Sequence, residues 1–281
     1  MTEIRRRLGA ALRAHRNRAQ LTQKQLAELV GIPQPHVSRV ETGQALPNPE
    51  QVDAWAAATD ATADDRAALD ALAEAAATEA VAWRRHGRRL AELQADIADL
   101  EATARVVRAY HPLLVHGLLQ VPGYAAAVYE ARARIEGQDR GEVAEAVAAR
   151  VAKQAVLYRE GHQFSFLVTE AGLRWQVAPR DVTLAQLDRL DMASRLPNVW
   201  LGVLPMAEAA LWRWSGFTLY AERDDGGEDL VHLETLTTGL TVRNPVDVAR
   251  HLRAFDDLDA AAVHGPLARE LLARIAADLR G

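Results

Sequence analysis

The stretch LTQKQLAELVGIPQPHVSRVETG, residues 21–43, holds two short apolar-periodic segments on either side of one glycine. In the first segment Leu26, Leu29 and Val30 recur at the spacing of one helix face, and the hydroxyl of Thr22 can cap that helix. Gly31 can adopt the positive φ that a tight turn between helices needs. The stretch therefore predicts a helix, a glycine turn and a second helix within about twenty residues.

The second helix is expected to begin with two prolines, Pro33 and Pro35. Proline is tolerated in the first turn of a helix, because the N–H groups there have no intrahelical partner and the fixed φ of proline is already helical. Ile32, Val37 and Val40 then give this segment its buried side. The prolines are thus expected to start the second helix rather than to break it.

Residues 21–43 resemble the helix-turn-helix of lambda-repressor-like regulators of the xenobiotic-response-element type, in which T-Q-x-x-L-A-x-x-x-G leads through a turn to V-S-R-h-E-x-G. The matching residues are Thr22, Gln23, Leu26, Ala27, Gly31, Val37, Ser38, Arg39, Glu41 and Gly43. The resemblance implies a mainly α, five-helix DNA-binding domain, with the fourth helix near 49–58 and the fifth near 64–77. The chain departs from the pattern at Pro33, which replaces the usual Ser or Thr cap, and at Pro35, which replaces a polar residue.

The resemblance also implies which residues face DNA. Gln34, His36 and Arg39 occupy positions through which the family contacts base edges, and the planar fork of Arg39 matches guanine O6 and N7. Gln23 and Thr42 are expected to contact phosphates, Gln23 because it starts a helix whose N–H groups favour an oxygen anion. The alternative for each is an ordinary solvated residue on a helix surface.

Two further residues, Arg16 and Glu41, match positions that pair across the domain in this family. They are expected to form a structural ion pair between the first and third helices, without contacting DNA.

Charge is distributed unevenly along the chain. The net charge is −5, yet residues 1–40 carry +6, so that the remainder carries −11. A basic end on an acidic body fits a nucleic-acid-binding head, and the alternative is that arginine-rich amphipathic helices simply solvate one face. With the helix-turn-helix resemblance, the expected partner is double-stranded DNA. The chain has no cysteine, no stretch that reads as a signal peptide and no apolar run long enough to span a membrane. We therefore expect a cytoplasmic protein without membrane contact.

A second resemblance begins near residue 100 and runs in order over some 170 residues. It is to the uncharacterised domain that actinobacterial regulators of this type often carry after the helix-turn-helix. The motif positions present are Gly117, Leu118, Leu119, Gln120, Tyr124, Ala125, Arg150, Gln154, Glu170, Leu173, Gln186, Pro205, Phe217 and Glu234. His116-Gly117 replaces an expected Pro-Gly, and residues 211–214, LWRW, replace small residues. The resemblance implies an architecture but no activity.

The pattern of the same region predicts an α+β domain. Helices are expected near 103–133, 141–160, 183–196 with Thr183 as cap, 245–257 and 266–279, and strands near 163–169, 199–204, 216–222, 230–236 and 239–243. Residues 76–100 are rich in alanine and charge, and are expected to form a helical connector. A dimerising coiled coil is the alternative there, but its heptad spacing lasts little more than one repeat. The expected domains are 1–75 and 101–281.

No catalytic motif stands out, and the catalytic residues stay unassigned. His232 and Glu234 would share a strand face but lack a third ligand, so we expect neither a metal nor a cofactor. Four tryptophans fall within forty residues of a chain with 5% aromatic residues: Trp175, Trp200, Trp212 and Trp214. Such a cluster favours a small-molecule pocket or, alternatively, ordinary core or an interface. The residues assigned to the pocket are Trp200, Trp212, Trp214, Arg150, Glu170, Arg174 and Glu234.

These observations lead to a transcriptional regulator that binds operator DNA as a homodimer and senses a small molecule or a small partner protein through its second domain. The alternative is an enzyme derived from such a regulator, with a tryptophan-lined active site in the second domain.

Overall fold

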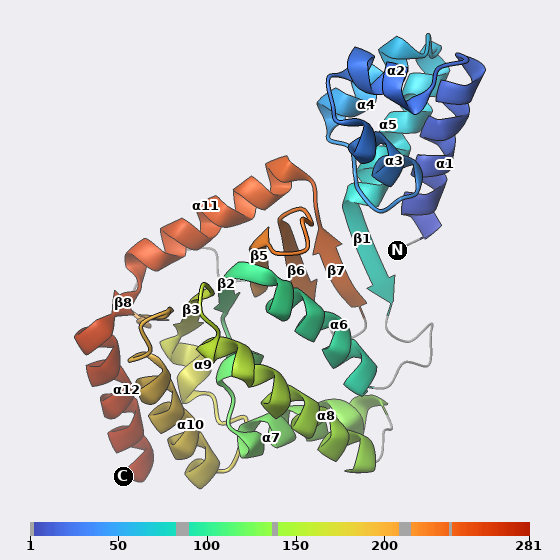
Figure 1. The fold of residues 1–281 in the computed structure, drawn as a ribbon. Helices are drawn as coiled ribbons and strands as arrows, with labels where there is room; N and C mark the ends of the chain where they lie inside the picture. Colours follow the sequence, from blue (N-terminus) through green and yellow to red (C-terminus); the bar gives the residue numbers. More distant parts are fainter. Residues whose placement is uncertain (1–2, 83–89, 137–139, 208–214, 236–237) are drawn as a thin grey trace. The chain divides into compact units, whose positions relative to one another are not determined.

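The computed structural model describes residues 3–82, 90–136, 140–207, 215–235 and 238–281 (Figure 1). The chain forms two compact units. The first consists of residues 1–81 together with 240–248, and the second of residues 82–239 together with 249–281.

Five helices make up most of the first unit, as the sequence predicts. They are α1 (Glu3–Arg18), α2 (Gln23–Val30), α3 (Gln34–Glu41), α4 (Pro49–Ala58) and α5 (Ala63–Ala77). Their apolar faces meet in one core in which Leu12, Leu26 and Trp55 are fully buried. Burial of such side chains stabilises a fold by roughly 1.5–3 kcal/mol each.

The first unit also takes in a segment from far along the chain. Residues 240–248 bring strand β7 (Thr238–Val242) beside strand β1 (Thr78–Ala82), which directly follows α5. The backbone N–H of Arg243 donates to the carbonyl of Ala77 at 2.8 Å. The unit is therefore discontinuous in sequence.

Local hydrogen bonds set where the helices of this unit begin. Thr22 and Gln25 form a reciprocal capping box at α2, and Gly31 ends α2 with φ of 75°. Pro33 precedes α3 without a side-chain cap, and Pro35 lies in its first turn. The sequence-based expectation for both ends of the turn is confirmed.

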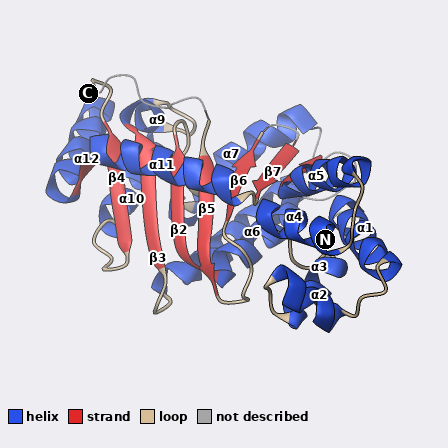
Figure 2. Cartoon of the chain, turned by 90° about the horizontal axis from the view of Figure 1, so that it is seen from above, coloured by secondary structure: helices blue, strands red, loops and turns tan. Residues whose placement is uncertain are grey.

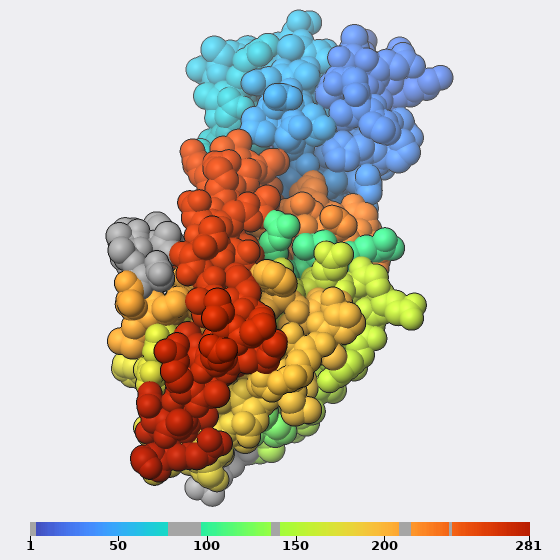
Figure 3. All heavy atoms as spheres, turned by 90° about the vertical axis from the view of Figure 1, so that its left-hand side faces the viewer, coloured from blue at the N-terminus to red at the C-terminus, as the bar shows by residue number. Residues whose placement is uncertain are grey.

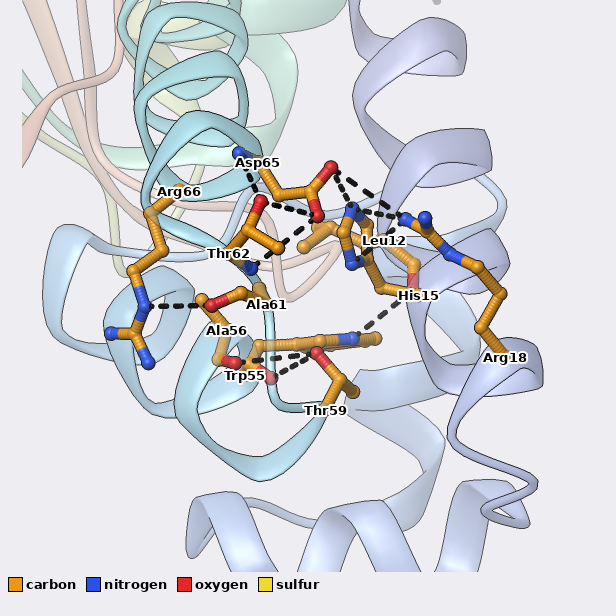
Figure 4. Close-up of polar contacts among 10 residues, drawn as sticks. All are labelled: Leu12, His15, Arg18, Trp55, Ala56, Thr59, Ala61, Thr62, Asp65 and Arg66. Atoms are coloured by element: carbon orange, nitrogen blue, oxygen red, sulfur yellow. Dashed lines mark hydrogen bonds and ion pairs between the residues drawn. The ribbon is translucent and has the colours of Figure 1, made fainter.

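The start of α5 is fastened to the end of α1 (Figure 4). Asp65 and Thr62 hydrogen-bond each other at that start, and Asp65 Oδ1 also lies 3.8 Å from His15 Nε2 and 3.9 Å from an Arg18 nitrogen. Below them Trp55 Nε1 donates to the Leu12 carbonyl at 3.2 Å. These contacts fix the positions of α4 and α5 relative to α1, the helix at the basic end of the chain.

The second unit is built on a mixed sheet (Figure 2). Its strands lie in the order β6 (Leu230–Glu234), β5 (Phe217–Arg223), β2 (Ala104–His111), β3 (Gln163–Thr169), β4 (Val199–Leu204), β8 (Val263–His264). Strands β2, β3 and β4 are parallel, with Ala109 opposite Phe166 and Phe166 opposite Leu201, and the other pairs are antiparallel.

Helices cover both faces of this sheet. They are α6 (Leu90–Thr103), α7 (Pro122–Glu136), α8 (Arg140–Lys153), α9 (Glu170–Arg174), α10 (Arg180–Ala193), α11 (Pro245–Ala261) and α12 (Gly265–Arg280). Helices α10 and α12 pack through Leu190 and Ile275 on the face that carries Phe166. On the opposite face the ring of His251 in α11 meets Phe217 at 5.1 Å.

The expected α+β architecture is confirmed, and β3 and β4 match their predicted bounds, but three local expectations are wrong. Residues 76–100 were expected to form a helical connector, whereas residues 78–82 form strand β1, which pairs with β7. A single helix was expected over 103–133, whereas the chain forms β2, a short 3-10 helix (Gly117–Leu119) and then α7. Strand β2 pairs on both sides and buries Val107 and Tyr110 completely, so sheet pairing overrides helix propensity there. Thr183 does not cap α10, because Pro179 precedes that helix and the Thr183 hydroxyl donates to the Ala178 and Pro179 carbonyls.

Candidate functional site

The exposed surface of α3 carries two of the three residues predicted to contact bases. Gln34 and Arg39 are exposed, while Val37 and Val40 hold the helix to the core from its other side. His36 is half-buried, and its Nε2 is enclosed without a hydrogen-bond partner among the described residues. Of the three predicted residues, Gln34 and Arg39 are thus the ones whose side chains are exposed to a partner.

Thr42, a predicted phosphate contact, is exposed at the end of α3. Its hydroxyl donates to the carbonyls of Ser38 and Arg39, at 3.0 and 3.1 Å. The hydroxyl therefore satisfies two carbonyl groups at the end of the helix, and its oxygen can still accept a hydrogen bond.

Arg16 and Glu41 are brought together across the first unit. Arg16 donates through Nε and Nη2 to the two oxygens of Glu41, at 3.0 Å for Nη2 and Oε2, and through Nη1 to the Leu21 carbonyl at 2.8 Å. The side chains are 10% and 2% exposed. A bidentate pair this well enclosed links α1 to the end of α3. Gly9 permits the close approach, because a Cβ there would lie 2.6 Å from the Val40 carbonyl oxygen.

Two further side-chain hydrogen bonds, not predicted from the sequence, extend from this ion pair toward the surface. Gln23 Nε2 donates to Glu41 Oε2 at 2.8 Å, and Gln34 Nε2 donates to Gln23 Oε1 at 2.9 Å. The side-chain amide of Gln23, predicted to contact a phosphate, is therefore engaged within the protein. The backbone N–H groups at the start of α2 still point out of that helix toward any anion placed there.

The residues predicted to line a pocket in the second unit lie in separate places. Arg150 places its guanidinium 4.4 Å from the centre of the Tyr129 ring and donates to Gln120 Oε1 at 2.7 Å. Trp200 lies on β4, is 52% exposed and stacks on His264 at 4.7 Å. Trp212 and Trp214 lie outside the described residues.

Glu170 and Arg174 form a second group, on α9. Arg174 donates to Glu170 Oε1 and to Asp278 Oδ2, both at 2.8 Å, and Glu170 also accepts from the Met206 N–H at 3.0 Å. Burial acts to raise the pKa of Glu170, but the hydrogen bonds from the Met206 N–H and the Arg174 guanidinium outweigh it and lower the pKa. This group ties α9 to α12 and to the end of β4.

A buried cluster of ionisable groups in the second unit was not predicted from the sequence. Glu101, 1% exposed, lies 2.9 Å from Lys153 Nζ and 3.9 Å from His116 Nε2. The rings of His116 and His111 meet edge to face at 5.1 Å. Burial raises the pKa of Glu101, against the effect of Lys153, and lowers the pKa of His116 well below its usual value.

Arg150 and Glu234, both predicted pocket residues, act on the same cluster. Burial lowers the pKa of His111 to about 4, while Glu234 raises it and Arg150 lowers it further. Glu234 is exposed, and its Oε1 lies 3.8 Å from His232 Nε2. Of the five predicted pocket residues within the described ranges, Arg150 and Glu234 are therefore the two whose charges act on these buried groups.

Residues 115–121 of the second unit form an irregular loop. Two motif residues, Gln154 and Gln186, hydrogen-bond to its backbone through their side chains. Gln154 donates to the Gly117 and Gln120 carbonyls, at 3.1 and 2.7 Å. Gln186 donates to the Leu119 carbonyl and accepts from the Val121 N–H, both at 2.8 Å. Each bond satisfies a backbone group that the irregular loop would otherwise leave unpaired. These glutamines therefore have a structural role.

Acidification is expected to destabilise the second unit through His111. A histidine whose folded pKa of about 4 lies below its unfolded value of 6.5 costs stability as the pH falls through that window. From pH 7 to pH 5 His111 alone should lower the free energy of unfolding by about 2 kcal/mol. Urea denaturation at both values would measure this loss. In the His111→Gln variant, which cannot titrate at this position, the drop in the free energy of unfolding from pH 7 to pH 5 should be smaller than in the wild-type chain by about 2 kcal/mol. An equal drop in both proteins would contradict the prediction.

Within the described ranges, no three or more His, Asp and Glu side chains are grouped to hold a metal ion. None of the helices described is both long enough and apolar enough to cross a membrane.

Comparison with known proteins gives two family matches. Residues 94–274 match the family described as a domain of unknown function, DUF5753, and residues 7–69 match a helix-turn-helix domain. No curated protein matches the chain. A solved structure of TrmBL2, an archaeal chromatin protein with a novel mode of DNA binding, is similar over 87% of this chain and 88% of that one, with 14% identity and a TM-score of 0.34. A similarity at this TM-score carries no information about function.

Proposed function

The chain belongs to the DUF5753 family, and from this premise we propose that it is a DNA-binding transcriptional regulator whose α3 reads base edges in the major groove. The helix-turn-helix match over residues 7–69 supports DNA as the partner. The observation that carries the proposal is the placement of Gln34 and Arg39, exposed on a helix whose other side is buried. The +6 charge of residues 1–40 supplies attraction to phosphates.

Replacing Arg39 with alanine tests this assignment. Loss of a bidentate contact to guanine should cost about 1–3 kcal/mol at one base pair and relax the preference there. The measurement is selection of bound duplexes from a random library at fixed salt, followed by titration of the selected site. Glu28→Ala, an exposed change on α2, serves as control. An unchanged preference in Arg39→Ala, or the absence of any enriched motif with the wild-type chain, would disprove the reading role.

We further propose that the protein acts as a homodimer on two half-sites about one helical turn, or a small multiple, apart. Footprinting on the selected duplex gives the spacing of protected half-sites. A single protected half-site with a monomer bound would count against the dimer.

The second unit is proposed to sense a small molecule or a partner protein. Helices α10 and α12 lie side by side on one face (Figure 3), and a groove of about 540 Å³ between them is lined by apolar Leu187, Leu272 and Ala276 and by five charged side chains. A concave surface that combines apolar side chains with polar groups is found at ligand sites. Native mass spectrometry of the chain from its own host would reveal a retained molecule or partner.

A further inference from the structure

We propose that the second unit binds a small planar aromatic carboxylate on the face of its sheet that α11 crosses, with the ring stacked on Trp200 and the carboxylate held by Arg108. The inference rests on the proposed sensing function and deepens it, since it names a class of ligand and a place for it away from the groove between α10 and α12. Its structural basis is one row of three side chains on neighbouring strands: Arg108, Ser165 and Trp200.

The register of the sheet puts this row on one face. Arg108 of β2 lies opposite Ser165 of β3, which lies opposite Trp200 of β4, and paired residues share a face of the sheet. Trp200 Nε1 donates to Asp259 Oδ1 of α11, so this is the face on which α11 lies. Because neighbouring strands are about 4.8 Å apart, the Cα atoms of Arg108 and Trp200 lie roughly 10 Å from each other. The cation and the ring can therefore hold the two ends of one small molecule.

Helix α11 leaves the row accessible. It packs near the carboxyl end of β2, where its His251 meets Phe217, and Figure 2 shows the remaining parts of β2, β3 and β4 in view beside it. Trp200 is 52% exposed, and Arg108 and Ser165 are half-buried. A ligand can thus approach all three side chains from the same side.

Arg108 offers a cation that the described part of the chain does not pair. Its guanidinium has no hydrogen bond or ion pair with another described residue, although the chain beyond residue 40 carries a net charge of −11. A half-buried charge on a central strand costs free energy unless it is paired. The planar fork of arginine matches a carboxylate, with two parallel hydrogen bonds. The position therefore suits a carboxylate that comes from outside the chain.

Trp200 offers a ring that is already held in place. Its indole stacks on the ring of His264 at 4.7 Å and donates to Asp259 Oδ1 at 3.2 Å. Asp259 Oδ1 also lies 3.4 Å from His264 Nε2, so this carboxylate is engaged at the edge of the indole. An indole fixed by two contacts loses little side-chain entropy when a second ring stacks on its exposed part. The position therefore suits a planar aromatic group.

Ser165 stands between the two and completes the row. Its hydroxyl has no side-chain hydrogen bond to another described residue, and it can donate to the carboxylate that Arg108 holds. The sequence of cation, hydroxyl and ring defines the ligand as a planar aromatic molecule with a carboxylate at one end. A saturated acid would lack the stacking, and a neutral aromatic would lack the contact with Arg108.

A competing interpretation is that Arg108 and Trp200 are ordinary surface residues that stabilise the sheet and bind nothing. It predicts that Arg108→Met lowers the midpoint of urea unfolding. The proposal predicts an equal or higher midpoint, because methionine keeps most of the apolar stem and removes a charge that has no partner among the described residues.

The experiment titrates the full chain with naphthoate in a calorimeter, and compares naphthamide, which is neutral, and decalin carboxylate, which is saturated. Arg108→Met should weaken the binding of naphthoate about 10- to 150-fold, as expected for a lost hydrogen bond to a charged group. Trp200→Leu should weaken it about 2- to 12-fold, the size of one stacked aromatic pair. Naphthamide should bind the wild-type chain and Arg108→Met with the same low affinity.

The matched controls are Arg180→Met and Trp175→Leu, the same chemical changes at exposed positions outside the row. Both should leave the affinity for naphthoate unchanged. Three results would overturn the inference: no binding of naphthoate at millimolar concentration, an unchanged affinity in Arg108→Met, or a lower urea midpoint in that variant.

Native mass spectrometry separates failure of this inference from failure of the sensing function. A host molecule or partner that both the wild-type chain and Arg108→Met retain would support sensing at another site and overturn this one. If the wild-type chain binds neither naphthoate nor any host molecule or partner, the proposed sensing function falls together with the inference.

Discussion

Replacing Glu41 with alanine should lower the free energy of unfolding of the first unit by about 3–5 kcal/mol. The change leaves the guanidinium of Arg16 enclosed at 10% exposure without its bidentate partner, and takes from Gln23 Nε2 its acceptor. Buried charges without a partner are among the few causes of so large an effect. Amide hydrogen exchange of α1 and α3 in the full chain, with and without urea, would measure the loss.

The double variant Arg16→Met with Glu41→Leu is the informative control. It removes both charges and keeps most of the volume, so it should be clearly more stable than Glu41→Ala, since apolar replacement of a buried pair is often neutral or favourable. A loss below about 0.5 kcal/mol in Glu41→Ala, the size of an ordinary surface change, would show that water compensates Arg16.

In the second unit, Lys153→Met should have a comparable effect of about 3–5 kcal/mol at neutral pH. Lys153 Nζ lies 2.9 Å from the carboxylate of Glu101, which is 1% exposed. Burial already raises the pKa of this carboxyl, and losing the ammonium raises it further. Global urea unfolding of the second unit, monitored by circular dichroism, gives the free energy.

The pH dependence of that variant has a definite sign. The folded pKa of Glu101 lies above its unfolded value, so stability falls as the pH rises from the unfolded pKa to the folded one. The penalty should therefore be larger at pH 8 than at pH 5, and adding Glu101→Gln should remove most of it. Arg195→Met, which breaks an exposed pair with Asp191, should cost about 0–1 kcal/mol at either pH. An equal loss in the free energy of unfolding for Lys153→Met at both pH values would contradict the raised pKa of Glu101 as its cause.

The helices around the turn could be predicted because their signals are local. Thr22 and Gly31 mark a cap and a turn by themselves. The expected bounds of α4 came from the resemblance instead, and that helix begins at its expected residue, directly after the capping residue Asn48. The alternation in β3 and β4 is also local. Strand β2 escaped prediction because its identity depends on partners on both sides, β3 and β5, that come later in the chain.

The candidate site shows the same limit. Exposure of Gln34 and Arg39 follows from their place on one helix, and the resemblance supplied the pairing of Arg16 with Glu41. The contact between Gln34 and Gln23 depends on how two helices cross, and that between Glu101 and Lys153 joins residues 52 positions apart in sequence. No spacing rule within one element reports such contacts.

The two-part composition of the first unit bears on how the protein is made. On a ribosome α1 to α5 can form as soon as they emerge, since their core uses only nearby residues. Strand β1 can pair with its neighbour β7 only after about 160 further residues have been synthesised. Until then β1 has an open edge, which is the kind of surface that pairs with other nascent chains. Slow translation of the second unit should therefore increase aggregation more than slow translation of the first.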